Sequence, residues 1–195
     1  HDCLRSFYRL VQDIPASVSV INKAAIAIKG DFSGLSAVTR APGFASSASP
    51  GNGGTATSVR GFNGHSSVVY TYDGTRLYVG AGTVSFPADT WTVDRIEVLR
   101  GPGSVINGVG AIGATVNYVP KKPAFKPVEN EIAVTVGSFN LQRYALGSGG
   151  QINTQLAYRF DAVNHSTDGY VDRADEERRA VAGALLFKPS DTLTL

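Results

Sequence analysis

Apolar and polar side chains alternate along residues 154–162 of this chain. A period of two places successive side chains on opposite faces of an extended strand, whereas an amphipathic helix repeats its apolar residues three and four positions apart. The alternation therefore predicts a strand with one apolar and one polar face. The apolar face would carry Leu156, Tyr158, Phe160 and Ala162, and the other face Gln155, Arg159 and Asp161.

The segments around this strand extend the pattern. Residues 131–136 also alternate, and residues 179–188 do so less regularly. Short connections are expected at 149–153 and 188–191, whereas residues 166–178 form a long, polar and acidic segment. Short turns at one edge of a sheet and longer loops at the other are typical of a membrane β-barrel. A soluble antiparallel sheet alternates in the same way, so the pattern alone leaves both interpretations open.

The first region of the chain begins with helix signals. Asn22 can cap a helix that runs through Ile28 and ends at Gly30. Asp31 can cap a second helix, which has to end before Pro42 because proline interrupts helical hydrogen bonding. The sequence therefore predicts two short helices in succession.

The rest of the first region reads as strands and turns. The small, polar stretch 45–57 indicates a mobile surface loop, and Asp73-Gly74 is typical of a hairpin turn. Mixed helices and strands with long connections predict a small α+β domain up to Pro127. Its strands are expected at residues 17–21, 58–60, 68–72, 95–99 and 114–119.

Residues 108–113 match the G-x-G-x-x-G pattern of dinucleotide-binding loops. That chemistry needs a strand that runs directly into the glycines and a helix whose first amides face the phosphates. Here the preceding strand ends several residues earlier, and the segment 114–119 that follows is rich in β-branched and aromatic residues before Pro120. The pattern therefore favours glycines in tight turns between two strands over a nucleotide site.

Composition narrows the range of functions. A net charge of +2 over 195 residues does not indicate a nucleic-acid partner. Cys3 is the only cysteine, so no internal disulfide is expected, and the three histidines have no metal-ligand spacing. We find no catalytic motif in the sequence, and we expect neither enzymatic activity nor a resident metal or cofactor. The chain contains no methionine and begins at His1, so we expect a processed or truncated piece.

Five sequence blocks together resemble a known family. They are QDIPASVSVI, SVRGF, YDGTRL, RIEVLRGPGSVINGVGAIGATVNYVPKKP and YRFDAVNHSTDGYVD. These blocks are similar to the plug domain and first barrel strands of TonB-dependent outer-membrane receptors, most closely the ferric-siderophore branch. The chain departs from that family at Ile106-Asn107-Gly108, where Leu-Tyr-Gly is usual, and at Ala114, where a second glycine is usual.

The resemblance implies a domain organisation. Residues 1–11 stay unassigned, residues 12–127 would form an α+β plug with a mixed β-sheet and short helices, and residues 128–195 would form the first antiparallel strands of a transmembrane β-barrel. We expect four complete barrel strands and the beginning of a fifth, fewer than the eight that close the smallest membrane barrels. The chain as printed is therefore not expected to transport a ligand by itself.

The resemblance also implies a function. The whole protein would lie in the bacterial outer membrane, in contact with outer-membrane lipid. It would bind a ferric siderophore and import it while the plug gates the barrel lumen. TonB and its inner-membrane energising complex would be partners, and iron would arrive as a chelate and not as a protein-bound cofactor. Two alternatives stay open: a receptor of the same family that takes up cobalamin or a glycan or that signals, and, more remotely, a soluble dinucleotide-binding enzyme.

The resemblance assigns roles to individual residues. Ligand contacts are expected from His65 and Ser66, and from the loop that spans Val79 to Phe86. Two arginines, Arg60 and Arg100, would latch the plug to barrel glutamates. The remaining plug motif residues are Glu97, Gly101, Pro102, Gly108, Gly113 and Asn117.

Overall fold

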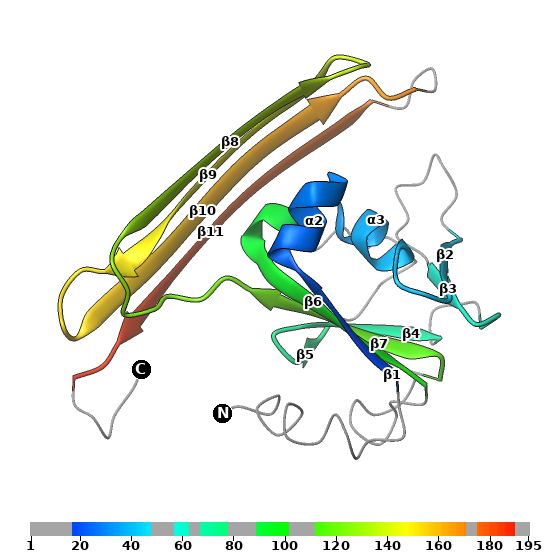
Figure 1. Cartoon of the computed structure of the whole chain (residues 1–195), viewed down its shortest axis with the longest axis horizontal. Coiled ribbons are helices and arrows are strands. Elements are labelled where there is room, and N and C mark those ends of the chain that lie inside the picture. The colour runs from blue at the N-terminus through cyan, green and yellow to red at the C-terminus, as the bar shows by residue number, and fades with distance from the viewer. Residues whose placement is uncertain are drawn as a thin grey trace. The chain divides into compact units, whose positions relative to one another are not determined.

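The computed structural model describes residues 17–47, 57–62, 67–77, 89–101, 112–170 and 175–189 (Figure 1). The chain divides into two compact units, His1–Pro120 and Lys121–Leu195. The first unit combines helices with a mixed sheet, and the second is a single antiparallel sheet. The predicted sequence of an α+β region followed by antiparallel strands is confirmed.

Strand β1 (Ser17–Asn22) leads directly into helix α2 (Lys23–Lys29). The Asn22 side chain accepts a hydrogen bond from the Ala25 amide at 2.8 Å, which satisfies one of the unpaired donors at the start of the helix. Gly30 ends the helix in the left-handed region at φ 64°, where a side chain would be strained. The predicted cap and end of this helix are confirmed because both depend on residues within one helical turn.

Helix α3 (Gly34–Thr39) differs from the prediction at its first residue. Its cap is Ser33, whose hydroxyl accepts from the Ser36 amide at 3.1 Å, and not Asp31. The buried Asp31 carboxylate instead pairs with Arg40 Nε at 2.7 Å. The ion pair and the buried position fix Asp31 before the helix begins, so the prediction that Asp31 caps this helix is wrong.

The main sheet of the first unit has five strands in the order β1-β6-β7-β4-β5. All neighbouring pairs are antiparallel except β4 and β7, which are parallel. Asp73 and Gly74 form the turn between β4 and β5, and both have positive φ, as a tight hairpin turn requires. The strands are β4 (Val68–Tyr72), β5 (Thr75–Arg76), β6 (Val93–Arg100) and β7 (Ala114–Pro120).

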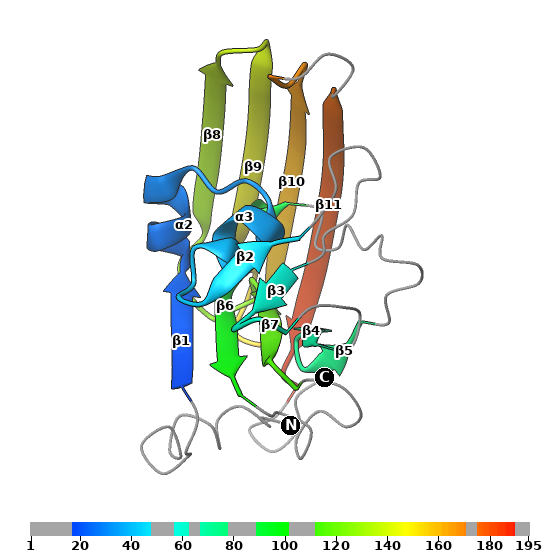
Figure 2. The ribbon, with the colours of Figure 1, turned by 90° about the vertical axis from the view of Figure 1, so that its right-hand side faces the viewer.

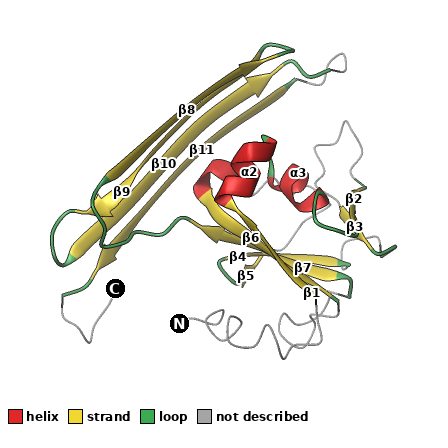
Figure 3. Ribbon diagram, viewed as in Figure 1, coloured by secondary structure: helices red, strands yellow, loops and turns green. Residues whose placement is uncertain are grey.

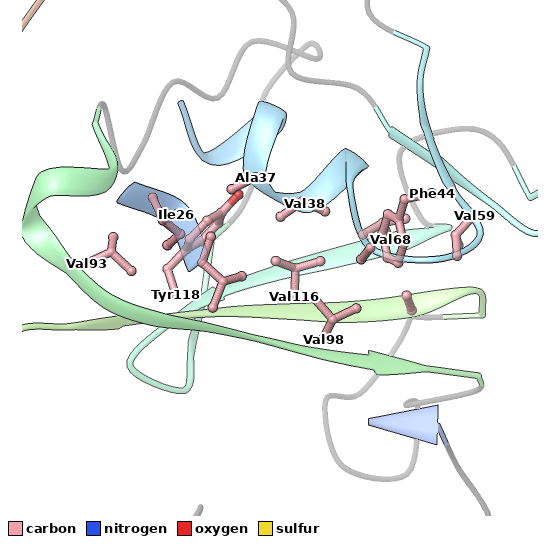
Figure 4. Packing of buried hydrophobic residues seen from close by; sticks show 13 residues of the cluster. Ile26, Ala37, Val38, Phe44, Val59, Val68, Val93, Val98, Val116 and Tyr118 are labelled. Carbon is pink, nitrogen blue, oxygen red and sulfur yellow. The ribbon is translucent and has the colours of Figure 1, made fainter. Parts of the chain in front are cut away.

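The hydrophobic core of the first unit lies between the sheet and its helices (Figure 4). Ile26 of α2 and Val38 of α3 pack toward the strands, where Ile96, Val98 and Val116 are completely buried. Full burial of each such aliphatic side chain contributes about 1.5–3 kcal/mol. The alternation of buried residues along β6 therefore determines which face of the sheet the helices cover.

A small second sheet pairs β2 (Phe44–Ser46) with β3 (Thr57–Val59). The prediction of a loop over residues 45–57 is therefore wrong at both ends, where Ala45 pairs with Ser58 and Ser46 with Thr57. Pairing between the two ends overrides their weak strand propensity. A short 3₁₀ helix, η1 (Thr90–Thr92), precedes β6. None of the helices in the part of the chain that the structure describes has the length and apolar character needed to cross a membrane.

The second unit is a four-stranded antiparallel sheet in the order β11-β10-β9-β8 (Figures 2 and 3). Four barrel strands were expected, but no residue range was predicted for β9, and residues 149–151, expected in a short connection, belong to it. Its glycines obscure the apolar alternation, since glycine is unfavourable in strands. Residues 166–167 and 176–178, expected in the long acidic segment, are also strand residues, whereas 190–191 of the other expected connection lie outside the described residues. The four strands are β8 (Glu129–Gly137), β9 (Leu141–Gln151), β10 (Leu156–Thr167) and β11 (Glu176–Phe187).

The strand register gives this sheet two chemically different faces. Ile132 pairs with Leu146, which pairs with Ala162, which pairs with Val181, so these four side chains share one face. We call it the apolar face. Its exposed large side chains are Ile132, Val134, Val136, Tyr144, Leu146, Phe160, Val181, Leu185 and Phe187. The opposite, charged face carries Glu131, Arg143, Arg159, Asp161, His165 and Arg178.

Candidate functional site

Four residues predicted to touch a ligand, His65, Ser66, Val79 and Phe86, lie outside the described residues, and so do the plug motif residues Pro102 and Gly108. These assignments stay predictions. The other predicted residues are described and lie in the first unit. They are the two arginines, the pair Glu97 and Asn117, and the pair Gly101 and Gly113.

Arg100, the last residue of β6, is buried among neutral oxygens. Its Nη2 donates to Ser17 Oγ at 2.7 Å and to Ser19 Oγ at 2.6 Å, and its Nη1 donates to the Pro42 carbonyl at 3.1 Å. Ser17 and Arg100 are register partners in the pairing of β1 with β6. The guanidinium therefore joins the first strand of the sheet to the segment that follows α3, and these hydroxyl and carbonyl oxygens satisfy a charge that would be costly to bury alone.

Arg60 has a different setting, because it is exposed in a turn after β3. Its backbone has a positive φ of 48°, and its amide donates to the Gly43 carbonyl at 3.0 Å. Gly61 continues the turn at φ 83°. The two predicted latch arginines thus differ, since one side chain is buried in hydrogen bonds and the other is held at the surface.

Glu97 and Asn117 form the centre of a second group. They are register partners in β6 and β7, and Asn117 Nδ2 donates to Glu97 Oε2 at 3.0 Å. Asn117 Oδ1 accepts from Thr71 Oγ1 at 2.8 Å and from the Gly74 amide at 3.0 Å. Asn117 therefore links three strands and a turn through one buried side chain.

Arg95 completes this group by donating from Nε to Glu97 Oε1 at 2.9 Å. Its partial burial alone would lower the pKa of the guanidinium. Hydrogen bonds and charge from Glu97 and Asp94 outweigh burial and raise the pKa of Arg95. Arg95 and Glu97 are consequently a paired, charged couple at the edge of the network.

Two predicted motif glycines, Gly101 and Gly113, meet at the end of the sheet. The Gly101 amide donates to the Gly113 carbonyl at 2.8 Å, and the Gly113 amide donates to the Ser67 carbonyl at 2.9 Å. A Cβ on Gly113 would lie 2.4 Å from Val59 Cγ1, so no larger residue fits without a shift. Gly101 has φ 113°, a conformation that favours glycine.

The segment after Gly113 bears on the dinucleotide interpretation. It is strand β7, as expected from its β-branched residues, and not a helix whose amides could face a phosphate. In the described part of the pattern, Gly113 serves close packing and hydrogen bonding between strands, whereas the Ile112 side chain is exposed. In the described residues, no group of three or more His, Cys, Asp or Glu side chains is arranged to hold a metal ion.

The second unit contains an ion cluster on its charged face that the sequence did not predict as a unit. Lys121 Nζ lies 3.0 Å from Asp161 Oδ1, and Arg159 Nε lies 2.7 Å from Asp161 Oδ2. Glu131 completes the cluster through Lys121 at 3.4 Å. The alternation had placed Glu131, Arg159 and Asp161 on the polar side of their strands, but no local signal indicated Lys121.

Comparison with known proteins identifies the family. The model of the "TonB-dependent Receptor Plug Domain" matches residues 10–115, which is more than half of the chain. The chain belongs to the TonB-dependent receptors. Arg60, Arg100, Glu97, Gly101 and Gly113 lie inside the matched range, and Asn117 follows two residues after it.

Individual members of the receptor family match over much of the chain. The ferrioxamine receptor of Yersinia enterocolitica is 31% identical over 138 residues, which is 70% of this chain and 19% of that protein. The vitamin B12 transporter of Vibrio vulnificus is 34% identical over 115 residues, 58% of this chain and 19% of that protein. These proteins are receptors and transporters, not enzymes.

A solved structure matches both units. The ferripyoverdine receptor of the outer membrane of Pseudomonas aeruginosa, solved with ferripyoverdine bound, superposes with a TM-score of 0.77 at 25% identity. The match covers 92% of this chain and 24% of that receptor. The chain thus spans about a fifth to a quarter of the length of these two receptors. The fold is that of a plug domain followed by antiparallel strands of the receptor.

Proposed function

We propose that this chain is the plug and first wall strands of an outer-membrane receptor that imports a ferric siderophore. In this proposal residues 12–127 form the plug, residues 128–195 begin the barrel, and residues 1–11 precede both. The plug gates the lumen, and TonB with its inner-membrane complex supplies the energy. Iron passes through as a chelate and is not a resident cofactor.

The observation that carries the proposal is the two-faced sheet of the second unit. Its apolar face presents aliphatic and aromatic side chains on all four strands, as contact with lipid hydrocarbon requires. Its charged face carries carboxylates, arginines and a histidine, which suit a polar lumen. A family plug domain that precedes such a sheet in one chain supports a receptor wall over a soluble antiparallel sheet.

The ferric-siderophore assignment rests on relatives. The similar proteins include receptors named for ferrioxamine and for ferripyoverdine, although a vitamin B12 transporter also matches 58% of the chain. We infer that the ligand is a ferric siderophore. Ferrioxamine B, ferripyoverdine and cyanocobalamin serve as probes, with the full-length receptor purified in detergent. We expect the receptor to bind at least one of the two iron chelates and not to bind cyanocobalamin. Binding of cyanocobalamin alone would show that the ligand is not a ferric siderophore.

We infer that the plug loops with His65, Ser66 and the segment from Val79 to Phe86 contact the chelate. The support is the family position of these loops, because polar and aromatic side chains on loops commonly form ligand pockets. In the full-length receptor, the double substitution of His65 and Ser66 by alanine is expected to weaken chelate binding about tenfold or more. This loss corresponds to roughly one hydrogen bond between neutral groups for each residue. Unchanged affinity would remove both residues from the site.

We also infer that Arg60 and Arg100 latch the plug to carboxylates of the receptor wall. Arg60 is exposed and available for such a partner, whereas Arg100 would have to exchange part of its bonds to Ser17, Ser19 and Pro42. Arg60→Gln in the full-length receptor is expected to lower the temperature at which the plug unfolds within the barrel. Lys29→Gln removes an exposed charge from the end of α2 and serves as control. Equal unfolding temperatures for the parent and for both variants would argue against the latch.

A further inference from the structure

Lys121 is the first residue after the last strand of the plug sheet, and its ammonium group is buried between two carboxylates. Nζ lies 3.0 Å from Asp161 Oδ1 and 3.4 Å from Glu131 Oε2. The side chains of Lys121 and Asp161 are only 7% and 2% exposed. A charged lysine is stable in a buried site only if carboxylates lie beside it. Because both carboxylates belong to strands, the sheet and not the surrounding loop determines where Lys121 lies.

Arg159 is the second cation of this cluster, and the charge of Glu129 acts on it in addition to those of Asp161 and Glu131. Its Nε donates to Asp161 Oδ2 at 2.7 Å, and its Nη2 donates to Asp161 Oδ1 at 2.5 Å. The same Nη2 lies 3.8 Å from Glu131 Oε2. Removal of Lys121 would leave two carboxylates to share one arginine, so Lys121 balances the charge of the cluster.

The space for this cluster is made by glycines of β9. Gly147 is the register partner of both Glu131 and Asp161, so it lies between the two carboxylates. A Cβ on Gly147 would lie 2.8 Å from Arg159 Nη2 and 2.9 Å from Asp161 Oδ1. Gly149 leaves room in the same way for Arg159 Cδ. The charged groups therefore occupy a site that any larger residue at position 147 would disturb.

Residues 121–128, which connect β7 to β8, form a linker, and its far end is bound to the sheet through its backbone. The Gln151 amide donates to the Lys126 carbonyl at 2.8 Å. Gly150 also approaches the linker so closely that a Cβ there would lie 2.6 Å from Val128 Cα. Segment 121–128 is thus attached at both ends, by the ion cluster at Lys121 and by strand β9 near Lys126.

We propose that residues 121–128 are a fixed part of the receptor wall and that Lys121 is the positioning residue that anchors them. In this proposal the plug ends at Pro120 and not at Pro127, as the division of the chain into two units supports. Rearrangements of the plug would then leave residues 121–128 in place. This inference depends on contacts inside the second unit and not on which chelate the receptor carries.

The test measures linker motion by electron paramagnetic resonance in the full-length receptor in detergent. A nitroxide is attached at position 125 through Phe125→Cys, with native cysteines replaced by serine. Phe125 is 36% exposed, so a label there can report on the backbone. We expect an immobilised spectrum in the parent and at least a threefold shorter rotational correlation time in both Lys121→Met and Gly147→Ala. Lys121→Arg retains the charge and is expected to keep the label immobilised.

Two matched controls separate the anchor from general effects of substitution. Lys126→Met removes a lysine charge from the same linker but keeps the backbone carbonyl that binds Gln151. Gly183→Ala adds a methyl group to another strand glycine of this sheet, where a Cβ would meet nothing within 4 Å. Both controls are expected to match the parent. A second label at Val134, an exposed residue of β8, checks that the sheet stays folded in every variant.

The anchor also predicts coupling between its members. Lys121→Met on an Asp161→Asn background is expected to add little mobility, because the main partner of the lysine is already neutral. A label that stays immobilised in Lys121→Met while the Val134 label shows a folded sheet would overturn the proposal. So would equal loosening by Lys126→Met, or fully additive effects of the Lys121 and Asp161 substitutions.

Discussion

Glu97 and Asn117 face each other across β6 and β7, and the Asn117 amide group donates to the Glu97 carboxylate at 3.0 Å. The oxygen of the same amide binds Thr71 and the turn at Gly74, so both ends of one buried side chain are used. A neutral amide suits this position because it can donate to a carboxylate on one side and accept from a hydroxyl and an amide on the other.

Asn117→Ala is therefore expected to destabilise the plug by about 1–3 kcal/mol, since it leaves the buried Thr71 hydroxyl and the half-buried Glu97 carboxylate without this partner. Trp91 is the only tryptophan of the chain and lies in the first unit, so its fluorescence in urea reports on the plug alone. Asn130→Ala, in the second unit, also removes a hydrogen-bonded asparagine and is expected to leave the Trp91 transition unchanged. An unaltered urea midpoint for Asn117→Ala would contradict the role of this network.

Gly113→Ala tests the close packing at the end of the plug sheet. The new methyl group would overlap with Val59 Cγ1 and approach the Ser67 carbonyl to 3.0 Å, so we expect a loss of about 1–3 kcal/mol in unfolding free energy. Val59→Ala removes the overlapping carbon, and the double variant is expected to lose less than the sum of the two single losses. Strictly additive losses, measured from the same urea transitions, would show that Val59 does not limit the residue at position 113.

Alkaline pH is expected to destabilise the plug through Tyr118. Burial raises the pKa of this phenol, and the neighbouring Tyr70 raises it further. The rings of Tyr70 and Tyr118 are stacked, with their centroids 6.2 Å apart. Because the folded pKa is above the unfolded value of about 10, the stabilisation is complete below pH 10 and is lost as the pH rises beyond it.

Tyr118→Phe cannot ionise, so the urea midpoint of this variant is expected to fall less between pH 9 and pH 11 than that of the parent. Tyr170→Phe alters an exposed tyrosine of the second unit and serves as control. If the parent and Tyr118→Phe lose stability equally over this range, another group is responsible for the alkaline transition.

Limited proteolysis of the 195-residue chain in water is expected to leave a protected piece that ends near residues 120–130. The first unit has its own buried core, whereas the sheet of the second unit exposes an apolar face and two strand edges, β8 and β11. Mass spectrometry of the fragments gives the boundary. Uniform protection through Leu195 in a monomer would show that the barrel interpretation of the second region is wrong.

Local patterns were sufficient for much of the fold. The cap at Asn22, the end of the helix at Gly30 and the hairpin turn at Asp73-Gly74 were predicted because each depends on hydrogen bonds and φ angles within a few residues. Strand β4 matches its predicted range of 68–72, and the alternation in residues 154–162 correctly assigned the two faces of β10.

The predictions that failed depended on contacts between residues far apart in the sequence. Asp31 and Ser33 are both good cap residues, and the ion pair with Arg40, nine positions along the chain, decides between them. Strand β9 contains glycines that lower its strand propensity, yet Gly147 is required by the charged groups that pack over it. Neither reason is visible in a window of neighbouring residues.

By itself, the sequence determined the order of the two regions, the alternating faces of the second and the motif residues of the first. Only the tertiary structure decided which of those residues act together. Asn117 meets Thr71 across 46 positions of chain, and Lys121 meets Asp161 across 40. Such partners are brought together by strand pairing between distant segments, and the burial that makes their hydrogen bonds and charges effective exists only once the sheets have formed.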